Sequence, residues 1–309
     1  MATIDLGSPA PPAAGLLDAL PRRLALTLPE LRLAATYAGG APLPFVATEP
    51  APSGAFDQRL GISRASAQDQ AYAGALASLH DPAETLTRRG LLNDGTLDQG
   101  LAGALGLLAT PRVAVDLDVT IDGARARAWH READGAVATL ATADGLVFEL
   151  AWFAASAWAD ELARVPLLPT DQTLRGTALP DAIDVPFELL DAASEAVRSS
   201  RSDLLPVLAA RHSGACIGAD GRAIGDVELA SMLSALVIDA RGRLRALGTD
   251  VSGDETTVVG VVSWVLLADG WHALRPRREG ADHRVDVRRV EAADLAGDLA
   301  FVLTEVVGA

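Results

Sequence analysis

The chain has 309 residues, 50% of them hydrophobic and 22% charged, so it is too apolar for a disordered protein and long enough to bury a sizeable core. The formal net charge of −15 disfavours a nucleic acid as partner, because a polyanion is repelled. All 26 basic residues are arginine and Cys216 is the only cysteine, which excludes a Schiff-base lysine, a lysine-containing phosphate loop and an intramolecular disulfide.

The sequence carries no recognisable targeting or membrane segment. Asp5 stands where a signal peptide has positive charge, and prolines interrupt the following residues. The longest apolar run, Val258–Ala268, is much shorter than the ~20 residues that a transmembrane helix needs. We therefore expect a cytoplasmic protein with no membrane partner.

The N-terminal half begins with a strand and several helices. Prolines and acidic residues mark the helix starts, and leucines recur at helical spacing. The predicted elements are a strand at 23–27 and helices at 31–37, 65–80, 81–90 and 97–108. The glycines at 100, 103 and 106 share the last of these helices and favour close packing against it.

A four-stranded antiparallel meander is predicted over residues 113–152. Residues 113–121 alternate between apolar and polar, and Asp122-Gly123 is a two-residue hairpin turn. This register places Asp118 opposite Arg127 and Thr120 opposite Arg125. The sequence predicts further turns at Asp134-Gly135 and Asp144-Gly145, a helix at 153–165, and a proline-punctuated connector at 166–186.

The same plan returns in the C-terminal half. Helices are predicted at 187–197, 202–211 and 226–233. Strands follow at 235–239, 244–248, 256–268 and 271–275, with turns at Arg241-Gly242 and Asp269-Gly270, and a helix at 291–307 ends the chain. Strands and helices in separate runs predict an α+β fold. It would have two structurally similar halves, 1–166 and 167–309, each with a meander (113–152 and 235–275), in one compact unit whose sheets are joined or packed together with helices on the outside.

The chemistry-bearing residues do not form a recognisable active site, metal site or cofactor site. Asp116 and Asp118 share a strand face, but a solvated salt-bridged face explains the two aspartates more simply, and His130 is more simply a packed or edge histidine than a general base. His212 and Cys216 are four residues apart without a second ligand pair, so a small buried thiol is the simpler interpretation. A hydrolase that uses one of these groups remains the weaker alternative.

Two features favour a binding protein. Trp264 and Trp271 flank one hairpin turn in a chain with only 4% aromatic residues, and tryptophan is common both at interfaces and in cores. Residues 275–289 contain six arginines and three acidic residues, which suits either an anionic partner or a solvated loop before the last helix.

Three segments carry a resemblance to a known family: RLALTLPELRLAATYAGGAPLPF (23–45), LTRRGLLNDGTLDQGLAGALGLLATPRVAVDLDV (86–119) and ADGWHALRP (268–276). In these stretches the chain resembles the EspG family, cytosolic chaperones of type VII (ESX) secretion in actinobacteria. The resemblance implies two pseudo-symmetric halves around an antiparallel sheet flanked by helical bundles. It departs from the family pattern at DETTVVGVVSWVLL (254–267), where an expected acidic-threonine and glycine-arginine-aromatic pattern is missing.

The resemblance also implies a function without catalysis, metal or cofactor. Such chaperones shield the apolar tip of a PE–PPE heterodimer before export. The partner-binding residues expected on this basis are Asp122, Gly123, Trp264, Leu266, Trp271 and Arg275, and Trp271→Ala would weaken the complex without unfolding the chain. A general adaptor or regulator of the same fold without a PE–PPE partner is the alternative, and a weak homodimer is compatible with either.

Overall fold

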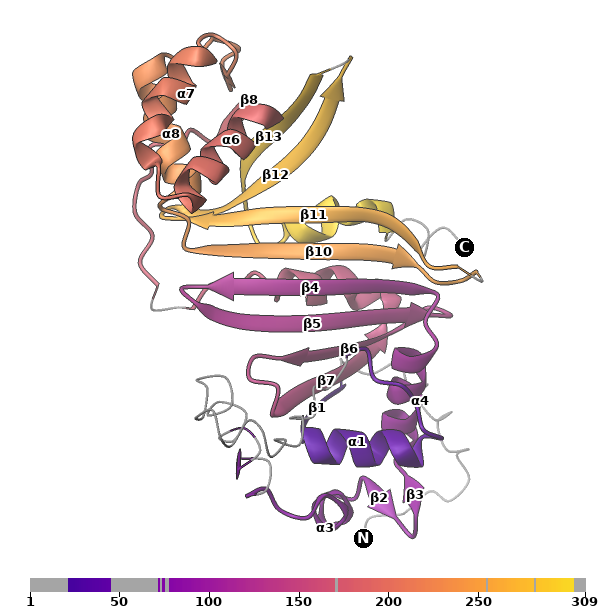
Figure 1. The fold of residues 1–309 in the computed structure, drawn as a ribbon. Helices are drawn as coiled ribbons and strands as arrows, with labels where there is room; N and C mark the ends of the chain where they lie inside the picture. The colour runs from indigo at the N-terminus through magenta and orange to yellow at the C-terminus, as the bar shows by residue number, and fades with distance from the viewer. Residues whose placement is uncertain are drawn as a thin grey trace, which may run out of the picture. The chain divides into compact units, whose positions relative to one another are not determined.

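The computed structural model describes residues 22–45, 72, 74–75, 78–169, 172–253, 255–280 and 282–302. Its elements in chain order (Figure 1) are β1 (Arg22–Thr27), α1 (Leu28–Tyr37), α3 (Pro82–Arg88), β2 (Leu92–Asn93), β3 (Thr96–Leu97), α4 (Gln99–Ala109), β4 (Val113–Ile121), β5 (Ala124–Ala133), β6 (Ala136–Thr142), β7 (Val147–Ala154), the 3₁₀ turn η2 (Ala155–Ala157), α5 (Trp158–Ala163), β8 (Ala182–Pro186), α6 (Phe187–Arg198), the 3₁₀ turn η3 (Ser202–Leu204), α7 (Leu205–Arg211), β9 (Ile217–Gly218), α8 (Asp226–Val237), β10 (Gly242–Asp250), β11 (Thr257–Leu267), β12 (Gly270–Glu279), β13 (Asp282–Val290) and α9 (Asp294–Asp298). The sheet order is β1-β7-β6-β5-β4-β10-β11-β12-β13-β8-β9, an 11-stranded antiparallel sheet, while β2 and β3 form a separate hairpin. The predicted α+β class is confirmed.

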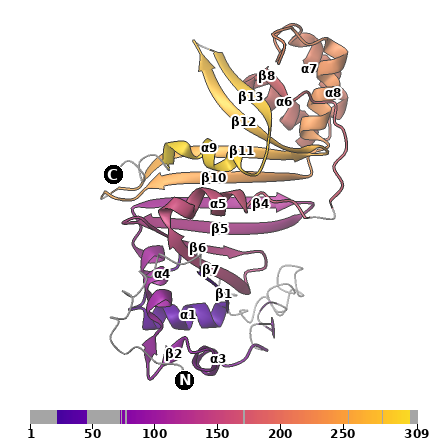
Figure 2. The same ribbon diagram turned by 180° about the vertical axis from the view of Figure 1, so that it is seen from behind.

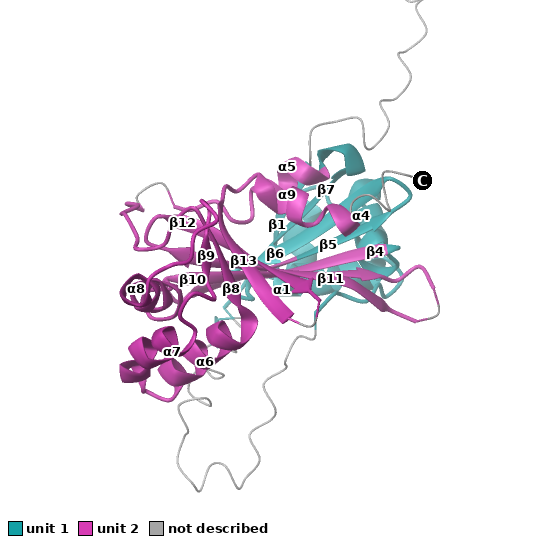
Figure 3. Cartoon of the chain, turned by 90° about the horizontal axis from the view of Figure 1, so that it is seen from above, with its two compact units in different colours: residues 1–112, 129–157 teal, residues 113–128, 158–309 magenta. Residues whose placement is uncertain are grey.

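The chain divides into two compact units, shown in different colours in Figure 3. Unit 1 contains residues 1–112 and 129–157, and unit 2 contains residues 113–128 and 158–309. In unit 1 the opening strand β1 pairs with the last meander strand β7, and in unit 2 β8 pairs with β13 in the same way. The predicted boundary at residue 166 and the symmetry of the halves stay predictions.

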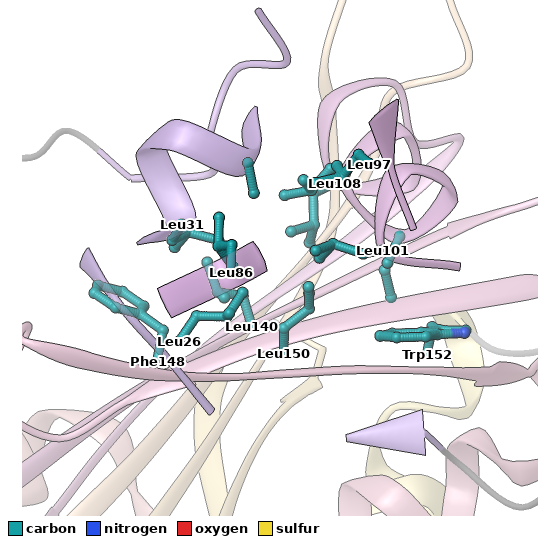
Figure 4. Packing of buried hydrophobic residues seen from close by; sticks show 14 of the residues in the cluster. Leu26, Leu31, Leu86, Leu97, Leu101, Leu108, Leu140, Phe148, Leu150 and Trp152 are labelled. Carbon is teal, nitrogen blue, oxygen red and sulfur yellow. The ribbon is translucent and has the colours of Figure 1, made fainter. Parts of the chain in front are cut away.

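Unit 1 buries one face of its strands under the helices α1, α3 and α4. Leucines from the helices meet leucines and aromatic rings from β1, β6 and β7 (Figure 4). Leu31, Leu86 and Leu101 on the helices and Leu140 and Leu150 on the strands have no solvent-exposed surface. Burial of such side chains contributes about 1.5–3 kcal/mol each, so this apolar layer stabilises the unit.

The start of α1 is fixed by a capping box. The Thr27 hydroxyl accepts the Glu30 backbone N–H, and the Glu30 carboxylate accepts the Thr27 backbone N–H at 2.7 Å. Glu30 is 97% buried, and Arg89 donates to its carboxylate at 3.3 Å. These reciprocal bonds satisfy free donors at the helix N-terminus, which is why the helix begins at Leu28, slightly before the predicted residue 31.

The three glycines of α4 have different surroundings. A Cβ at Gly100 would lie 2.9 Å from Cζ2 of the Trp152 ring, whereas a Cβ at Gly103 or Gly106 would meet nothing within 4 Å. The predicted close packing therefore holds for Gly100 alone among the three.

This difference gives a matched pair of variants. Gly100→Ala is expected to destabilise the fold by about 1–2 kcal/mol, because overpacking against the rigid indole outweighs the gain in helix propensity. Gly103→Ala is expected to stabilise it by about 0.5–1 kcal/mol. Urea unfolding of both variants checks the prediction, and equal shifts for the two would contradict it.

Unit 2 carries helices on both faces of its strands. On one face α6, α7 and α8 cover the strands β8, β12 and β13 and part of β11. On the opposite face lie α5 and α9, which contact each other (Figure 2). The two helical layers leave part of β10 and β11 uncovered on the α6 side, where Arg243, Leu247 and Val261 are exposed.

Two of the predicted Asp-Gly hairpin turns have positive φ at both residues, as expected. Asp122 and Gly123 have φ values of 47° and 86°, and Asp134 and Gly135 have values of 52° and 77°. Both central residues of a two-residue turn of this kind need positive φ, which Asp-Gly tolerates. The first meander thus spans 113–154, close to the predicted 113–152.

The second meander begins later than predicted. The strand at 235–239 and the turn at Arg241-Gly242 are wrong, because α8 continues to Val237 and β10 begins at Gly242. The buried residues of α8 follow helical spacing into the supposed strand: Leu229, Met232, Leu233 and Leu236.

The arginine-rich segment 275–289 is not a loop. It forms most of the β12–β13 hairpin, so the meander extends to Val290 rather than to residue 275. Val285 and Val287 are buried and alternate with charged residues, which is a strand pattern. The predicted connector 166–186 likewise ends in the strand β8, which pairs with β13.

The remaining helices differ mainly at their ends. Strand β7 extends to Ala154, so α5 begins only at Trp158 rather than at residue 153. The final helix, predicted over 291–307, is represented by α9 and a helical turn at 300–302; residues 303–309 lie outside the described residues, as does most of the helix predicted at 65–80. The other helices agree with prediction within a few residues, except for the extension of α8.

Candidate protein-binding groove

A groove opens in unit 2 where β12 separates from β11. The two strands pair only over Trp264–Leu267 and Gly270–Ala273, after which β12 pairs with β13 alone. Figure 1 shows β12 and β13 diverging from β11, with α6 beside them. The resulting α6–sheet groove has a volume of about 600 Å³ and is lined by Phe187, Leu190, Asp191, Ser194, Val197, Arg198, Leu236, Val237, Arg243, Arg245, Ser263, Val265 and Leu274.

Helix α6 uses two faces. Its buried face, Leu189, Ala193 and Ala196, packs into the core of unit 2. A second face follows the same i, i+3, i+4, i+7 spacing and forms the groove wall: Phe187, Leu190, Asp191, Ser194, Val197 and Arg198. Phe187 is 49% exposed, so this aromatic residue of the groove lining is accessible to a partner.

The groove floor is one face of β10 and β11. Along β10 the exposed Arg243 and Arg245 alternate with the buried Leu244 and Ala246. Their cross-strand neighbours on β11 are Val265 and Ser263, respectively. Because successive strand residues point to opposite faces, both arginines lie on the groove side.

The arginines of the groove differ in whether they form an ion pair. Glu195 binds Arg198 at 2.8 Å, but neither Arg243 nor Arg245 has a carboxylate within 4.0 Å among the residues that the structure describes. Asp191 is the acidic residue of the lining. The groove therefore combines a wall of mixed apolar and polar side chains with two arginines on its floor that form no ion pair with a described residue.

Four of the six expected partner-binding residues lie away from this groove. Trp264, Leu266 and Trp271 share the opposite sheet face and are at most 3% exposed. The Trp264 indole donates to Asp298 of α9 at 2.8 Å, and Arg275 binds the same carboxylate. The structure thus places the two tryptophans and the leucine in the core, where their side chains do not face solvent.

The other two residues, Asp122 and Gly123, form the exposed tip of the β4–β5 hairpin. The Asp122 carboxylate accepts hydrogen bonds from Arg241 at 2.8 and 3.1 Å and from Gln172 at 2.9 Å. Asp122 therefore ties the hairpin to the start of β10 and to the segment before β8. Its contribution to partner binding stays a prediction.

Two of the residues considered for catalysis, Asp118 and His130, have different surroundings. Asp118 forms an exposed ion pair with Arg125, rather than with the predicted Arg127, and the Arg125 Nε lies 3.0 Å from both of its oxygens. His130 is fully inside unit 1, where burial, with a smaller contribution from the charge of Arg131, lowers its pKa to about 3.

Cys216 is also unsuited to nucleophilic chemistry. It is completely buried, and burial raises the pKa of its thiol to about 11, whereas nucleophilic cysteines need a lowered pKa. Among the described residues, no three His, Cys, Asp or Glu side chains are grouped to hold a metal ion. No helix in the same part of the chain is long and apolar enough to cross a membrane.

Two patterns in the sequence correspond to parts of the groove. The second face of α6 repeats apolar residues at helical spacing, and Arg243 and Arg245 interrupt a strand pattern at alternate positions. Neither pattern indicates that β12 leaves β11 after four pairs, and this divergence creates the groove.

The fold is EspG-like. Among solved structures, the chain is similar to the type VII secretion system chaperone EspG5 of Mycobacterium tuberculosis, solved in complex with the PE25–PPE41 dimer. The TM-score is 0.57 at 11% sequence identity, over 92% of this chain and 96% of that chain. No protein-family model matches the sequence, and no curated protein matches it.

Proposed function

We propose that this protein is a non-catalytic secretion chaperone, which acts in the cytoplasm of an actinobacterium and binds a PE–PPE-type substrate before type VII export. The observation that supports the proposal most is an open groove with apolar side chains in its walls in a chain of EspG-like fold. The chaperone of similar fold was solved in complex with the PE25–PPE41 dimer. Covering an apolar helical tip would keep such a substrate from aggregating.

The groove suits a helical segment because its wall and floor present different surfaces. Leu190 and Val197 on α6 face the same groove as Val265 and Leu274 on the sheet. An amphipathic helix laid between them would place its apolar stripe against these side chains, a recurring mode of recognition. Such a helix would bind without requiring the core of unit 2 to change.

The proposal is tested by co-expression with the PE–PPE pairs of the same genome, followed by size-exclusion chromatography with light scattering. The expected result is a 1:1:1 complex with at least one pair. A folded chain that elutes alone with every pair would contradict the chaperone function and favour the adaptor alternative. The same runs measure any homodimer.

A single aromatic residue tests whether the groove is the binding site. Phe187→Ser is expected to weaken the complex by about tenfold or more, because a partly exposed aromatic in a groove lining is typical of an interface anchor. The unfolding midpoint should change little, since the side chain is 49% exposed. Val207→Ser is the matched control on α7, with the side chain 61% exposed and outside the groove lining. Equal affinities for the two variants would place binding elsewhere.

A further inference from the structure

We infer that the α6–sheet groove selects an amphipathic helix that carries two carboxylates, one helical turn apart, beside its apolar stripe. The inference rests on the proposed function and names the chemistry of the segment that would be bound. The observation behind the inference is the pair of arginines on the groove floor, which are not part of the buried core of unit 2. The carboxylates would pair with Arg243 and Arg245.

The spacing of the arginines fits acidic residues on a helix. Arg243 and Arg245 are two residues apart on one strand face, a separation of about 7 Å along the strand. Side chains at i and i+4 of a helix are neighbours about 5–6 Å apart at Cβ. Flexible guanidinium groups can bridge this small difference, and each can bind a carboxylate through two N–H donors.

The surrounding charges favour one orientation of this helix. Asp191 lies on the α6 wall and would repel an acidic flank there, whereas Arg243 and Arg245 lie on β10. Asp118 is the cross-strand neighbour of Arg245 on β4, but its carboxylate is bound by Arg125. The acidic flank would therefore face β10 and the apolar stripe would face Leu190 and Val197.

The pair of arginines on the groove floor contrasts with the negative net charge of the protein. A chain with a formal net charge of −15 repels acidic partners overall. Two arginines that form no ion pair with a described residue would attract a carboxylate-bearing segment to the groove and reject a lysine-bearing one. Specificity, more than total affinity, is the expected consequence.

Three fluorescently labelled helical peptides test the inference by fluorescence anisotropy. They share one leucine stripe at i, i+3, i+4 and i+7 and differ only at two flanking positions four residues apart, which are both Glu, both Gln or both Lys. The Glu peptide is expected to bind about fivefold tighter than the Gln peptide, because two partly exposed ion pairs contribute modestly. The Lys peptide should bind weakest, and 0.5 M NaCl should largely remove the preference.

Charge reversal in the groove supplies the decisive comparison. Arg243→Glu combined with Arg245→Glu should reverse the order, so that the Lys peptide binds tighter than the Glu peptide. Arg211→Glu combined with Arg222→Glu makes the same change in net charge at exposed positions outside the groove lining and should keep the wild-type order. Circular dichroism verifies that both double variants are folded.

Equal affinity of the wild type for the Glu and Gln peptides, an unchanged order in the groove variant, or no binding of any peptide would overturn the inference. These outcomes are separate from the co-expression trial. A PE–PPE complex without a preference for Glu would leave the proposed function standing. A Glu preference that reverses with the groove charges, in a chain that binds no PE–PPE pair, would contradict only the proposed function.

Discussion

Trp264→Ala is expected to lower the free energy of unfolding by about 3–5 kcal/mol, the largest effect of any substitution considered for this protein. The indole has no solvent-exposed surface, and its ring centroid lies 6.3 Å from that of Trp271. Alanine would leave a cavity under α9 and remove the hydrogen bond to Asp298. Asp298 would keep its ion pair with Arg275, so the loss comes mainly from packing.

Urea unfolding measures this effect, and Trp264→Phe is the matched control. Phenylalanine keeps most of the buried aromatic volume, so it should cost distinctly less than alanine. Trp271→Ala should resemble Trp264→Ala, since Trp271 is only 3% exposed and donates to the Pro166 carbonyl at 2.8 Å. A Trp264→Ala protein as stable as the wild type, yet unable to bind a partner, would instead place this residue at the interface.

Acidification from pH 7 to pH 5 is expected to cost about 2 kcal/mol of stability through His130 alone. Burial lowers the pKa of His130 to about 3 in the folded chain, against about 6.5 in the unfolded chain. The unfolded state therefore binds the proton more readily. The stability that His130 contributes is therefore fully present above pH 6.5 and is lost as the pH falls toward 3.

His272 acts in the same direction, because burial lowers its pKa, although the nearby Asp269 carboxylate opposes this shift. Unfolding measured at pH 7, 6 and 5 gives the slope of stability against pH above the range in which most carboxylates titrate. His130→Gln should make this slope shallower, whatever its effect on stability at pH 7. Parallel slopes for the variant and the wild type would show that His130 is not the group responsible.

Local patterns in the sequence predicted the first meander well, because each strand boundary has a local cause. The Asp122-Gly123 turn needs two positive φ angles, and period-two alternation over residues 113–121 fixes which side chains share a face. The partner of Asp118 was less predictable. A directly opposite pair and a diagonal pair are both within reach of an arginine, and Arg125 forms the bond.

The candidate site was harder to predict because it depends on contacts between distant segments. The residues 261–267 are largely apolar on both strand faces, so alternation could not show that Trp264 and Leu266 face α9 while Ser263 and Val265 face α6. The groove itself follows from the early separation of β12 from β11. The residue nearest to that point with a local effect on pairing is Pro276 of β12, three residues after the last pair, which cannot donate a ladder hydrogen bond.

The most direct test of partner binding in the α6–sheet groove is hydrogen–deuterium exchange on this chain, alone and with a co-purified PE–PPE pair. If the groove holds the partner, complex formation should slow exchange in α6, at the C-terminal end of α8 and in the uncovered part of β10 and β11. Amides of α1 and α4 in unit 1 should be unaffected and serve as the internal reference. A complex that protects unit 1 and leaves the groove amides unchanged would show that the groove does not hold the partner.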